Sequence, residues 1–155
     1  MIPSTIETHL QEHHPGYEHH RHRTATSAQA LAHAEHRTGY HVAKPVAVRV
    51  GGRRAIAVVS APHRVRLGVL EEATGSPVEL VPEFEMWGWF LPCDVGAEPP
   101  LGVFGLPIFV DAELLTVKKI LMPGGTYQDS IVLDTDDWIR CEKVQEIPNL
   151  GGPVS

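Results

Sequence analysis

A lysine inside an apolar, strand-like run is the first residue of this sequence whose type and surroundings point to chemistry. Lys44 lies in the segment H-V-A-K-P-V-A-V-R-V, and in an extended chain it shares a face with Val42, Val46 and Val48. A buried ammonium group needs a partner, so Lys44 is either a charge that reaches solvent at a strand end or a cleft residue that binds an anion. Pro45 cannot donate a ladder hydrogen bond, which favours an edge or an opening of the sheet here.

A loop rich in glycine and proline is the second such feature. It contains the segment L-P-C-D-V-G-A-E-P-P-L-G-V-F-G, which precedes a short apolar run ending at Asp111. Proline has a fixed φ and no N–H, whereas glycine reaches conformations closed to other residues, so we expect a stiff irregular loop that leads into a buried strand. Backbone groups on such a loop are held ready for a ligand, and fixed N–H donors can stabilise an oxyanion at little reorganisation cost.

The sequence offers little support for a covalent intermediate on a side chain. It contains no G-x-S-x-G motif and no Cys-His signature. Ser60 and Cys93 remain the formal candidates for a nucleophile. A positioned water molecule is therefore the expected nucleophile.

Short elements that alternate along the chain must position these residues. The clearest prediction is a hairpin in which residues 41–50 and 55–60 are strands joined by a tight turn at Gly51-Gly52. Capping and periodicity predict helices over residues 5–14, from Ser27 to Gly39, between Pro62 and Gly75, and from Asp134 to Lys143. Further extended segments are expected at residues 17–23, 78–81, 106–111, 119–122 and 130–133, with a helical turn at 111–115.

These interleaved elements indicate an α/β (α+β) fold, a single domain with a mixed β-sheet and flanking short helices. The expected domain covers residues 1–150, and residues 151–155 are expected to form a flexible tail with little to bury. In the segment P-E-F-E-M-W-G-W-F, the side chains of Phe84, Trp87 and Phe90 are expected to share one helical face and to lie in the core rather than on a stacking surface.

Composition limits the class of protein. The 155 residues are 43% hydrophobic with a formal net charge of −6, which suits one globular domain with a sizeable core. The negative charge argues against a protein that holds long DNA or RNA through counterion release, so any nucleic-acid contact should be local. No apolar run approaches the roughly 18 residues of a membrane span, and the N-terminus lacks a secretory pattern. We therefore expect a cytoplasmic monomer with no membrane and no DNA partner.

Histidines crowd the first part of the chain, where nine of the ten precede Val42. His20 and His22 would share one face of a strand, but the sequence has no adjacent cysteine, no H-E-x-x-H motif and no helical histidine pair with a carboxylate at a known ligand spacing. The helical spacing of His9 and His13 is of the kind that arises by chance. We expect no metal and no other cofactor, with metal binding by His20 and His22 as the weaker alternative.

The order of several short segments resembles the YbaK family, also called the prolyl-tRNA-synthetase-associated or aminoacyl-tRNA deacylase family. The spacing from Gly96 to Gly102 is similar to the G-x-x-x-P loop of that family. The other shared features, in order, are Ser27-Ala28-Gln29 at a helix start, Ala43-Lys44 in a strand, Val110-Asp111, and Pro123-Gly124-Gly125 near the end. The resemblance extends from Tyr17 to Trp138, which is nearly the whole chain.

The resemblance implies a YbaK-like fold and a free-standing enzyme that deacylates mischarged aminoacyl-tRNA, acting in trans to a synthetase. The implied partners are the tRNA acceptor end and an aminoacyl-tRNA synthetase. Lys44 would lie near the 3′-terminal nucleotide and the loop at Gly96 would hold the ester, so these two are the catalytic assignment. Substrate contacts are assigned to four further loop residues, Ala97, Pro99, Pro100 and Gly102. They are also assigned to Gly124, Gly125 and Thr126 near the end of the chain and to Ser60 of the second hairpin strand.

One departure from the family pattern bears on specificity. Many relatives carry a histidine just after the late glycine pair, whereas this chain has Thr126 and Tyr127. The amino acid to be removed therefore stays open among alanine, cysteine, serine and others. The resemblance also implies that a ribose hydroxyl of the substrate can assist as base. The alternative hypothesis is a non-catalytic module that uses the same cleft to bind a tRNA end, a nucleotide or a partner protein.

Overall fold

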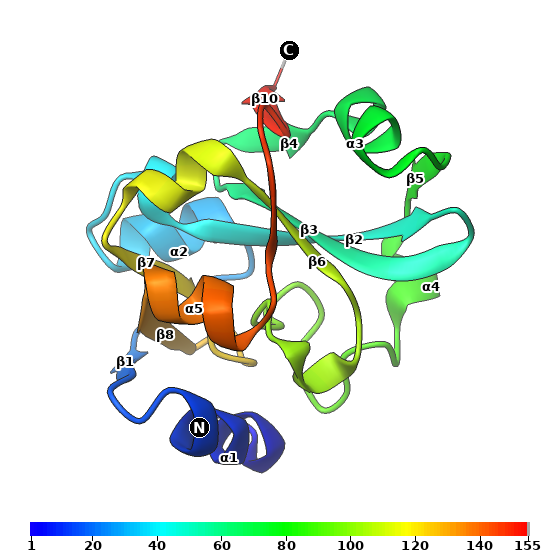
Figure 1. Ribbon diagram of the computed structural model, residues 1–155. Coiled ribbons are helices and arrows are strands. Elements are labelled where there is room, and N and C mark those ends of the chain that lie inside the picture. Colours follow the sequence, from blue (N-terminus) through cyan, green and yellow to red (C-terminus); the bar gives the residue numbers. More distant parts are fainter. Residues whose placement is uncertain (155) are drawn as a thin grey trace.

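A five-stranded mixed sheet with the strand order β5-β2-β3-β6-β9 forms the centre of the computed structural model, which describes residues 1–154 (Figure 1). Its strands are β5 (Val78–Leu80), β2 (Ala43–Val50), β3 (Arg53–Ser60), β6 (Ile108–Asp111) and β9 (Gln145–Ile147). β5, β2 and β3 are antiparallel neighbours, whereas β6 runs parallel to β3 and β9 parallel to β6. The predicted hairpin and the mixed sheet are confirmed.

A second, antiparallel sheet lies beside the first. Its order is β1-β8-β7, with β1 (Glu18–Arg21), β8 (Asp129–Asp134) and β7 (Lys119–Pro123). One parallel bridge joins Val42, just before β2, to Leu121 of β7, so the two sheets meet beside the start of β2. The glycine pair that follows β7 is thereby brought near the strand that carries Lys44.

Short helices complete the domain. They are α1 (Ser4–His13), α2 (Ala28–Ala34), α3 (Leu67–Thr74), α4 (Glu83–Met86) and α5 (Thr135–Cys141), with 3₁₀ turns η1 (Gly39–His41), η2 (Gly102–Phe104) and η3 (Ala112–Thr116). Two predicted caps are present, because Ser27 Oγ accepts a hydrogen bond from the Ala30 N–H and Asp134 Oδ1 accepts one from the Asp137 N–H, each at 3.1 Å. None of the helices within residues 1–154 has the length and apolar character needed to span a membrane.

The largest core cluster joins one face of the five-stranded sheet to the second sheet, α1 and α5. Ile6 and Leu10 of α1 and Trp138 of α5 are fully buried in it. The opposite face of β2 and β3 packs against α3 through Leu70. Trp138 also donates its Nε1–H to the carbonyl of Pro100 at 2.9 Å, which attaches the loop rich in glycine and proline to α5.

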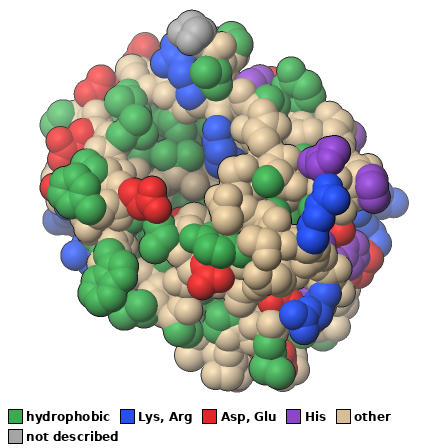
Figure 2. Space-filling model, turned by 180° about the vertical axis from the view of Figure 1, so that it is seen from behind, with side chains coloured by type: hydrophobic (Ala, Val, Ile, Leu, Met, Phe, Trp, Pro, Cys, Tyr) green, Lys and Arg blue, Asp and Glu red, His purple; other side chains and the backbone are tan. Residues whose placement is uncertain are grey.

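The aromatic segment after Pro82 differs from its prediction. α4 ends at Met86 and the chain leaves the helical conformation at Trp87, so three side chains spread over seven positions cannot share one helical face. Phe84 and Trp87 are 80% and 72% exposed, and of the three only Phe90 is buried. Figure 2 shows hydrophobic side chains standing out from one side of the surface. The predicted core position is therefore wrong for Phe84 and Trp87.

The C-terminal segment also differs from the expected flexible tail. Gly151–Pro153 form strand β10, which pairs antiparallel with β4 (His63–Val65), as seen at the top of Figure 1. Leu150, the residue before this strand, is fully buried in the cluster that includes Leu70. The backbone approaches its surroundings closely here, because a Cβ at Gly151 would lie 2.6 Å from Asp111 Oδ2. A segment with little side-chain bulk to bury is thus held by strand pairing and close backbone packing.

Because Leu150 is buried, we expect that shortening its side chain lowers the stability of the fold. Leu150→Ala should lower the free energy of unfolding by about 2–5 kcal/mol, because it removes buried methyl groups and leaves a cavity. Val154→Ala is the control, because Val154 is 67% exposed. Its free energy of unfolding should differ from that of wild type by no more than about 0.5 kcal/mol. Urea unfolding of both variants checks this, and equal small effects would contradict docking of the C-terminal segment.

Candidate functional site

Backbone hydrogen bonds hold the glycine-proline loop against the late glycine pair. Gly125 donates its N–H to the carbonyl of Ala97 at 2.8 Å, and Asp94 donates its N–H to the carbonyl of Gly125 at 2.9 Å. Tyr127 adds two contacts, from its N–H to Asp94 Oδ2 at 3.0 Å and from its hydroxyl to the Val95 carbonyl at 2.7 Å. Two segments that the sequence singled out separately are therefore one structural unit.

A pocket of about 340 Å³ opens between this loop and β2. Lys44 and Pro45 of β2 border it on one side, and Gly96 and Glu98 of the loop border it on the other. Its remaining lining comes from β2, the segment around α4, the loop and one residue before α2: Val46, Ala47, Val81, Glu83, Met86, Val95 and Thr26. The structure thus brings the two predicted catalytic residues, Lys44 and Gly96, to the same pocket.

Lys44 is half-buried and already has one hydrogen-bond partner. The register of the hairpin pairs it with Val59, and its ammonium donates to the backbone carbonyl of His63 at the start of β4. Desolvation by burial lowers the pKa of Lys44 below its ordinary value. An ammonium has three N–H donors, so two remain for an anion in the pocket.

Gly96 is exposed on the loop with a φ of +84°. This left-handed conformation costs a residue with a side chain about 1–2 kcal/mol, which explains the glycine. No atom lies within 4 Å of the position that a Cβ would take, so the glycine serves the backbone conformation rather than a tight contact. The loop can therefore point backbone groups at Gly96 toward a bound ligand.

Glu98 is a candidate functional residue that the sequence interpretation missed. It is 1% exposed, and its Oε2 atom has no hydrogen-bond partner among the described residues. Desolvation by burial raises the pKa of Glu98 to about 7, and the backbone N–H groups of Glu98 and Gly96 offset this only in part. A carboxyl group that titrates near neutral pH beside a pocket can exchange a proton with a ligand. Its sequence signal is that it is the one charged residue between Asp94 and Asp111, in a stretch rich in glycine and proline.

A second, much smaller cavity of about 10 Å³ lies on the other side of Gly96. Ala97 and Thr126 border it together with residues of α2 and its N-terminal approach. Thr126 donates its hydroxyl to Asp129 Oδ2 at 2.6 Å. Burial raises the pKa of Asp129, but hydrogen bonds from the Met1 amino group, Thr126 and His19 prevail and lower it to about 2. The cavity therefore borders a fixed negative charge and has room for about one water molecule.

Other predicted residues do not line either cavity. Pro99 and Pro100 belong to the loop but are buried. Gly102 donates its N–H to Glu142 Oε1 at 2.7 Å, and this contact lies away from the pocket. Gly124 and Gly125 are buried in the turn that supports Ala97. Their contribution is to hold the loop in place.

The two formal nucleophiles lack activation. Ser60 is 5% exposed, and its hydroxyl has no hydrogen-bond partner among the described residues. Burial raises the pKa of the Cys93 thiol to about 12, with the nearby carboxylates of Glu98 and Asp94 adding to the effect. A thiol with this pKa is a poor nucleophile at neutral pH. These observations support the expectation of water as nucleophile.

Titration of Glu98 predicts a pH-dependent stability. Its folded-state pKa of about 7 lies above the ordinary value of 4.5, so the native state binds the proton more tightly and the free energy of unfolding falls as pH rises between these values. At ~1.4 kcal/mol for each pKa unit, the loss reaches about 3 kcal/mol. Glu98→Gln cannot ionise, so urea unfolding from pH 4 to 8 should show wild type losing stability relative to the variant. Parallel curves would refute the raised pKa.

Three solved structures share this fold over nearly their whole length. A candidate trans-editing enzyme for prolyl tRNA synthetase has a TM-score of 0.80 at 19% identity, with 94% of each chain covered. The hypothetical protein APE2540 has a TM-score of 0.85 at 16% identity, with 96% of this chain and 99% of that chain covered. A scaffold protein from computational epitope backbone grafting has a TM-score of 0.82 at 18% identity, with 97% of each chain covered. At these identities the likeness shows the fold alone, and it confirms the predicted fold class.

A sequence match identifies the family. No curated protein matches this sequence significantly. Residues 22–141, however, match the family described as the aminoacyl-tRNA editing domain. The matched range contains Lys44, the loop at Gly96 and the turn at Gly124-Gly125, which are the features that carried the resemblance. This chain therefore belongs to the aminoacyl-tRNA editing domain family.

Proposed function

We propose that this protein is a free-standing deacylase that hydrolyses the ester of a mischarged aminoacyl-tRNA. The observation that carries the proposal is the pocket of about 340 Å³ bordered by both Lys44 and Gly96 in a chain of the editing family. This volume is at the lower end of ligand pockets, which hold about 300–1,000 Å³, and suits the terminal ribose with its aminoacyl ester better than a whole nucleotide.

The proposed reaction uses water as nucleophile. Water attacks the carbonyl carbon of the ester, the carbonyl oxygen takes up negative charge, and the bond from that carbon to the ribose oxygen breaks as this oxygen takes a proton. Backbone donors of the loop at Gly96 stabilise the oxyanion because their direction is fixed before the substrate binds. Lys44 holds the negatively charged end of the tRNA with the N–H groups that His63 does not use.

Amino-acid selection is assigned to the small cavity beside Ala97 and Thr126. A space for about one water molecule admits only the smallest side chains, so alanine and serine are the preferred candidates. Thr126 stands where many relatives have a histidine, and its hydroxyl is already engaged by Asp129. We expect steric exclusion by this cavity, rather than a new hydrogen bond, to reject larger amino acids.

Recognition of the tRNA is expected to be local. The net charge of −6 disfavours a long electrostatic track for RNA, so the acceptor end, or a synthetase that presents it, supplies the selectivity. The partners in this proposal are therefore the tRNA acceptor end and an aminoacyl-tRNA synthetase. Association of the protein with tRNA alone should be weak, and its salt dependence should be shallow because few phosphates are contacted.

Substitution of Lys44 tests the function directly. The assay compares wild type with Lys44→Ala on tRNAs charged with alanine, cysteine, serine, threonine and proline. The control is Lys118→Ala, which removes an exposed lysine outside the pocket. Lys44→Ala should lower kcat/KM for release of the amino acid about 10- to 100-fold, because it removes a charge-assisted contact to the tRNA that is worth about 1.5–3 kcal/mol, while the control keeps the wild-type value. An unchanged rate in Lys44→Ala would remove the assigned role, and tRNA binding without release by wild type would favour the non-catalytic module.

Gly96 provides an independent test with a closely matched control. Gly96 and Gly52 both have a positive φ, of +84° and +81°. Neither has an atom within 4 Å of the position that a Cβ would take. They differ in place, because Gly52 lies in the hairpin turn. Alanine at either position should cost about 1–2 kcal/mol of stability. Only Gly96→Ala should also lose deacylation, because it redirects the backbone donors; equal activity of the two variants would contradict the assignment.

A further inference from the structure

A buried group of two histidines and one glutamate lies outside the proposed active site. His9 and His14 come from α1 and the residue after it, and Glu142 directly follows α5. His9 Nε2 lies 2.9 Å from Glu142 Oε2 and 3.0 Å from Oε1, and His14 Nε2 lies 2.5 Å from Oε2. His14 and Glu142 are 5% and 6% exposed. Two imidazoles and one carboxylate therefore converge away from bulk solvent.

The donor atoms lie close enough together to become ligands of one divalent metal ion. One atom from each residue lies within 4.8 Å of the other two. A set of two histidines and a glutamate is a known three-ligand zinc set that keeps a fourth position for water. In a tetrahedral site with metal–ligand bonds of 2.0–2.2 Å, ligand atoms are about 3.3–3.6 Å apart. To admit the ion, Glu142 Oε2 must therefore separate by roughly 0.5 Å from His9 Nε2 and by roughly 1 Å from His14 Nε2, which rotation of these side chains can supply.

The fold holds these ligands in place. α1 is anchored in the core by Ile6 and Leu10, which are fully buried. Glu142 is the C-terminal cap of α5, and its carboxylate also accepts the N–H of Gly102 at 2.7 Å. A hydrogen bond of this kind orients a ligating carboxylate and is a usual feature of metal sites. The charge of Glu142 has no Lys or Arg partner among the ion pairs of residues 1–154, so a cation would compensate it.

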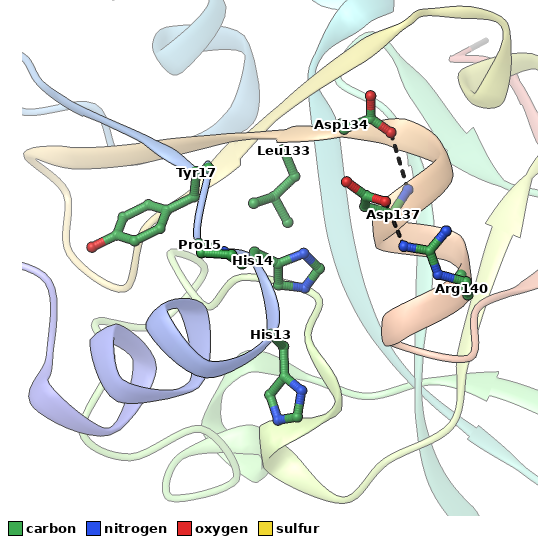
Figure 3. Close-up of a pocket in the computed structure, with 9 residues that line it drawn as sticks. His13, His14, Pro15, Tyr17, Leu133, Asp134, Asp137 and Arg140 are labelled. Carbon is green, nitrogen blue, oxygen red and sulfur yellow. Dashed lines mark hydrogen bonds and ion pairs between the residues drawn. The ribbon is translucent and has the colours of Figure 1, made fainter.

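Solvent can reach the group from two sides. His14 borders a pocket of about 310 Å³. Figure 3 shows the His14 ring between α1 and α5, with Asp137 and Arg140 across from the ring. His9 borders a separate hollow of about 380 Å³ together with residues of α1 and Val103. The partly exposed side chain of His9 is therefore the side from which an ion can approach the group.

We propose that His9, His14 and Glu142 bind one divalent transition-metal ion, with Zn²⁺ as the expected occupant, and that the ion fastens α1 to α5. The role is structural and independent of the proposed deacylation. The chain contributes His9 and His14 five residues apart and Glu142 128 residues after His14, so no ligand motif is visible in the sequence. For this reason the sequence-based expectation of no metal could not anticipate the group.

Zinc binding by the untagged full chain is the test. Protein treated with a chelator and then freed of it is titrated with Zn²⁺ by calorimetry, and wild type should bind one ion per chain. His9→Gln should weaken binding at least tenfold, a conservative expectation because loss of even an outer partner typically costs 10–100-fold. His33→Gln is the matched control, since His33 is an exposed histidine on another helix, α2, and His20→Gln controls for binding by the other histidine-rich segment. Both controls should bind as wild type does.

Thermal unfolding provides the second measurement and guards against a folding defect. His9 is partly exposed, so His9→Gln should remain folded without metal. One equivalent of Zn²⁺ should raise the Tm of wild type and of both controls, and EDTA should reverse the rise, whereas the Tm of His9→Gln should stay unchanged. The proposal is overturned if wild type binds no zinc, if His9→Gln binds as tightly as wild type, or if binding leaves the Tm of wild type unchanged.

Discussion

Two backbone hydrogen bonds between the loop at Gly96 and the turn at Gly125 are the constraint on which the candidate site depends. They join the Gly125 N–H to the Ala97 carbonyl and the Asp94 N–H to the Gly125 carbonyl. A loop that contains Pro99 and Pro100 has few backbone donors of its own, so its conformation must be fixed by contacts with other segments. The turn supplies these contacts, and the loop in turn forms one wall of the pocket opposite Lys44.

Burial of charge near this loop has a chemical consequence. Glu98 is almost completely removed from water without an ion partner, whereas Asp129 and Glu142 are buried with several hydrogen-bond donors. The pKa of the buried carboxyl group is therefore about 7 in Glu98 and about 2 in Asp129 and Glu142. Natural proteins retain an unpaired buried carboxyl at a cost in stability, and its position beside the pocket suits proton exchange with a substrate.

The sequence predicts the parts of this fold that depend on local interactions. The Gly51-Gly52 turn, the caps at Ser27 and Asp134 and the buried strand before Asp111 each follow from residues within a few positions of one another. The loop and Lys44 were also found, through residue type and family resemblance. Their common pocket could not be derived, because it depends on how β2, the loop and the turn pack in three dimensions.

Most of the missed features depend on contacts between distant parts of the chain. The flexible tail was expected because the segment has little to bury, but β10 packs beside β4. Phe84 and Trp87 follow a helical spacing, but α4 is too short to realise it. The histidines of α1 looked like chance spacings, because their carboxylate partner lies far away in sequence at the end of α5.

The N-terminal segment contacts the residues that hold the glycine-proline loop, which gives α1 a place in the site as a whole. At one end, the Met1 amino group binds Asp129 at 2.7 Å, and a Cβ at Gly125 would lie 2.7 Å from Pro3. At the other end, His9 and His14 contact Glu142, whose carboxylate accepts the N–H of Gly102. Because the loop between these points forms a wall of the pocket, the packing of α1 against the rest of the domain helps to fix the geometry of the site.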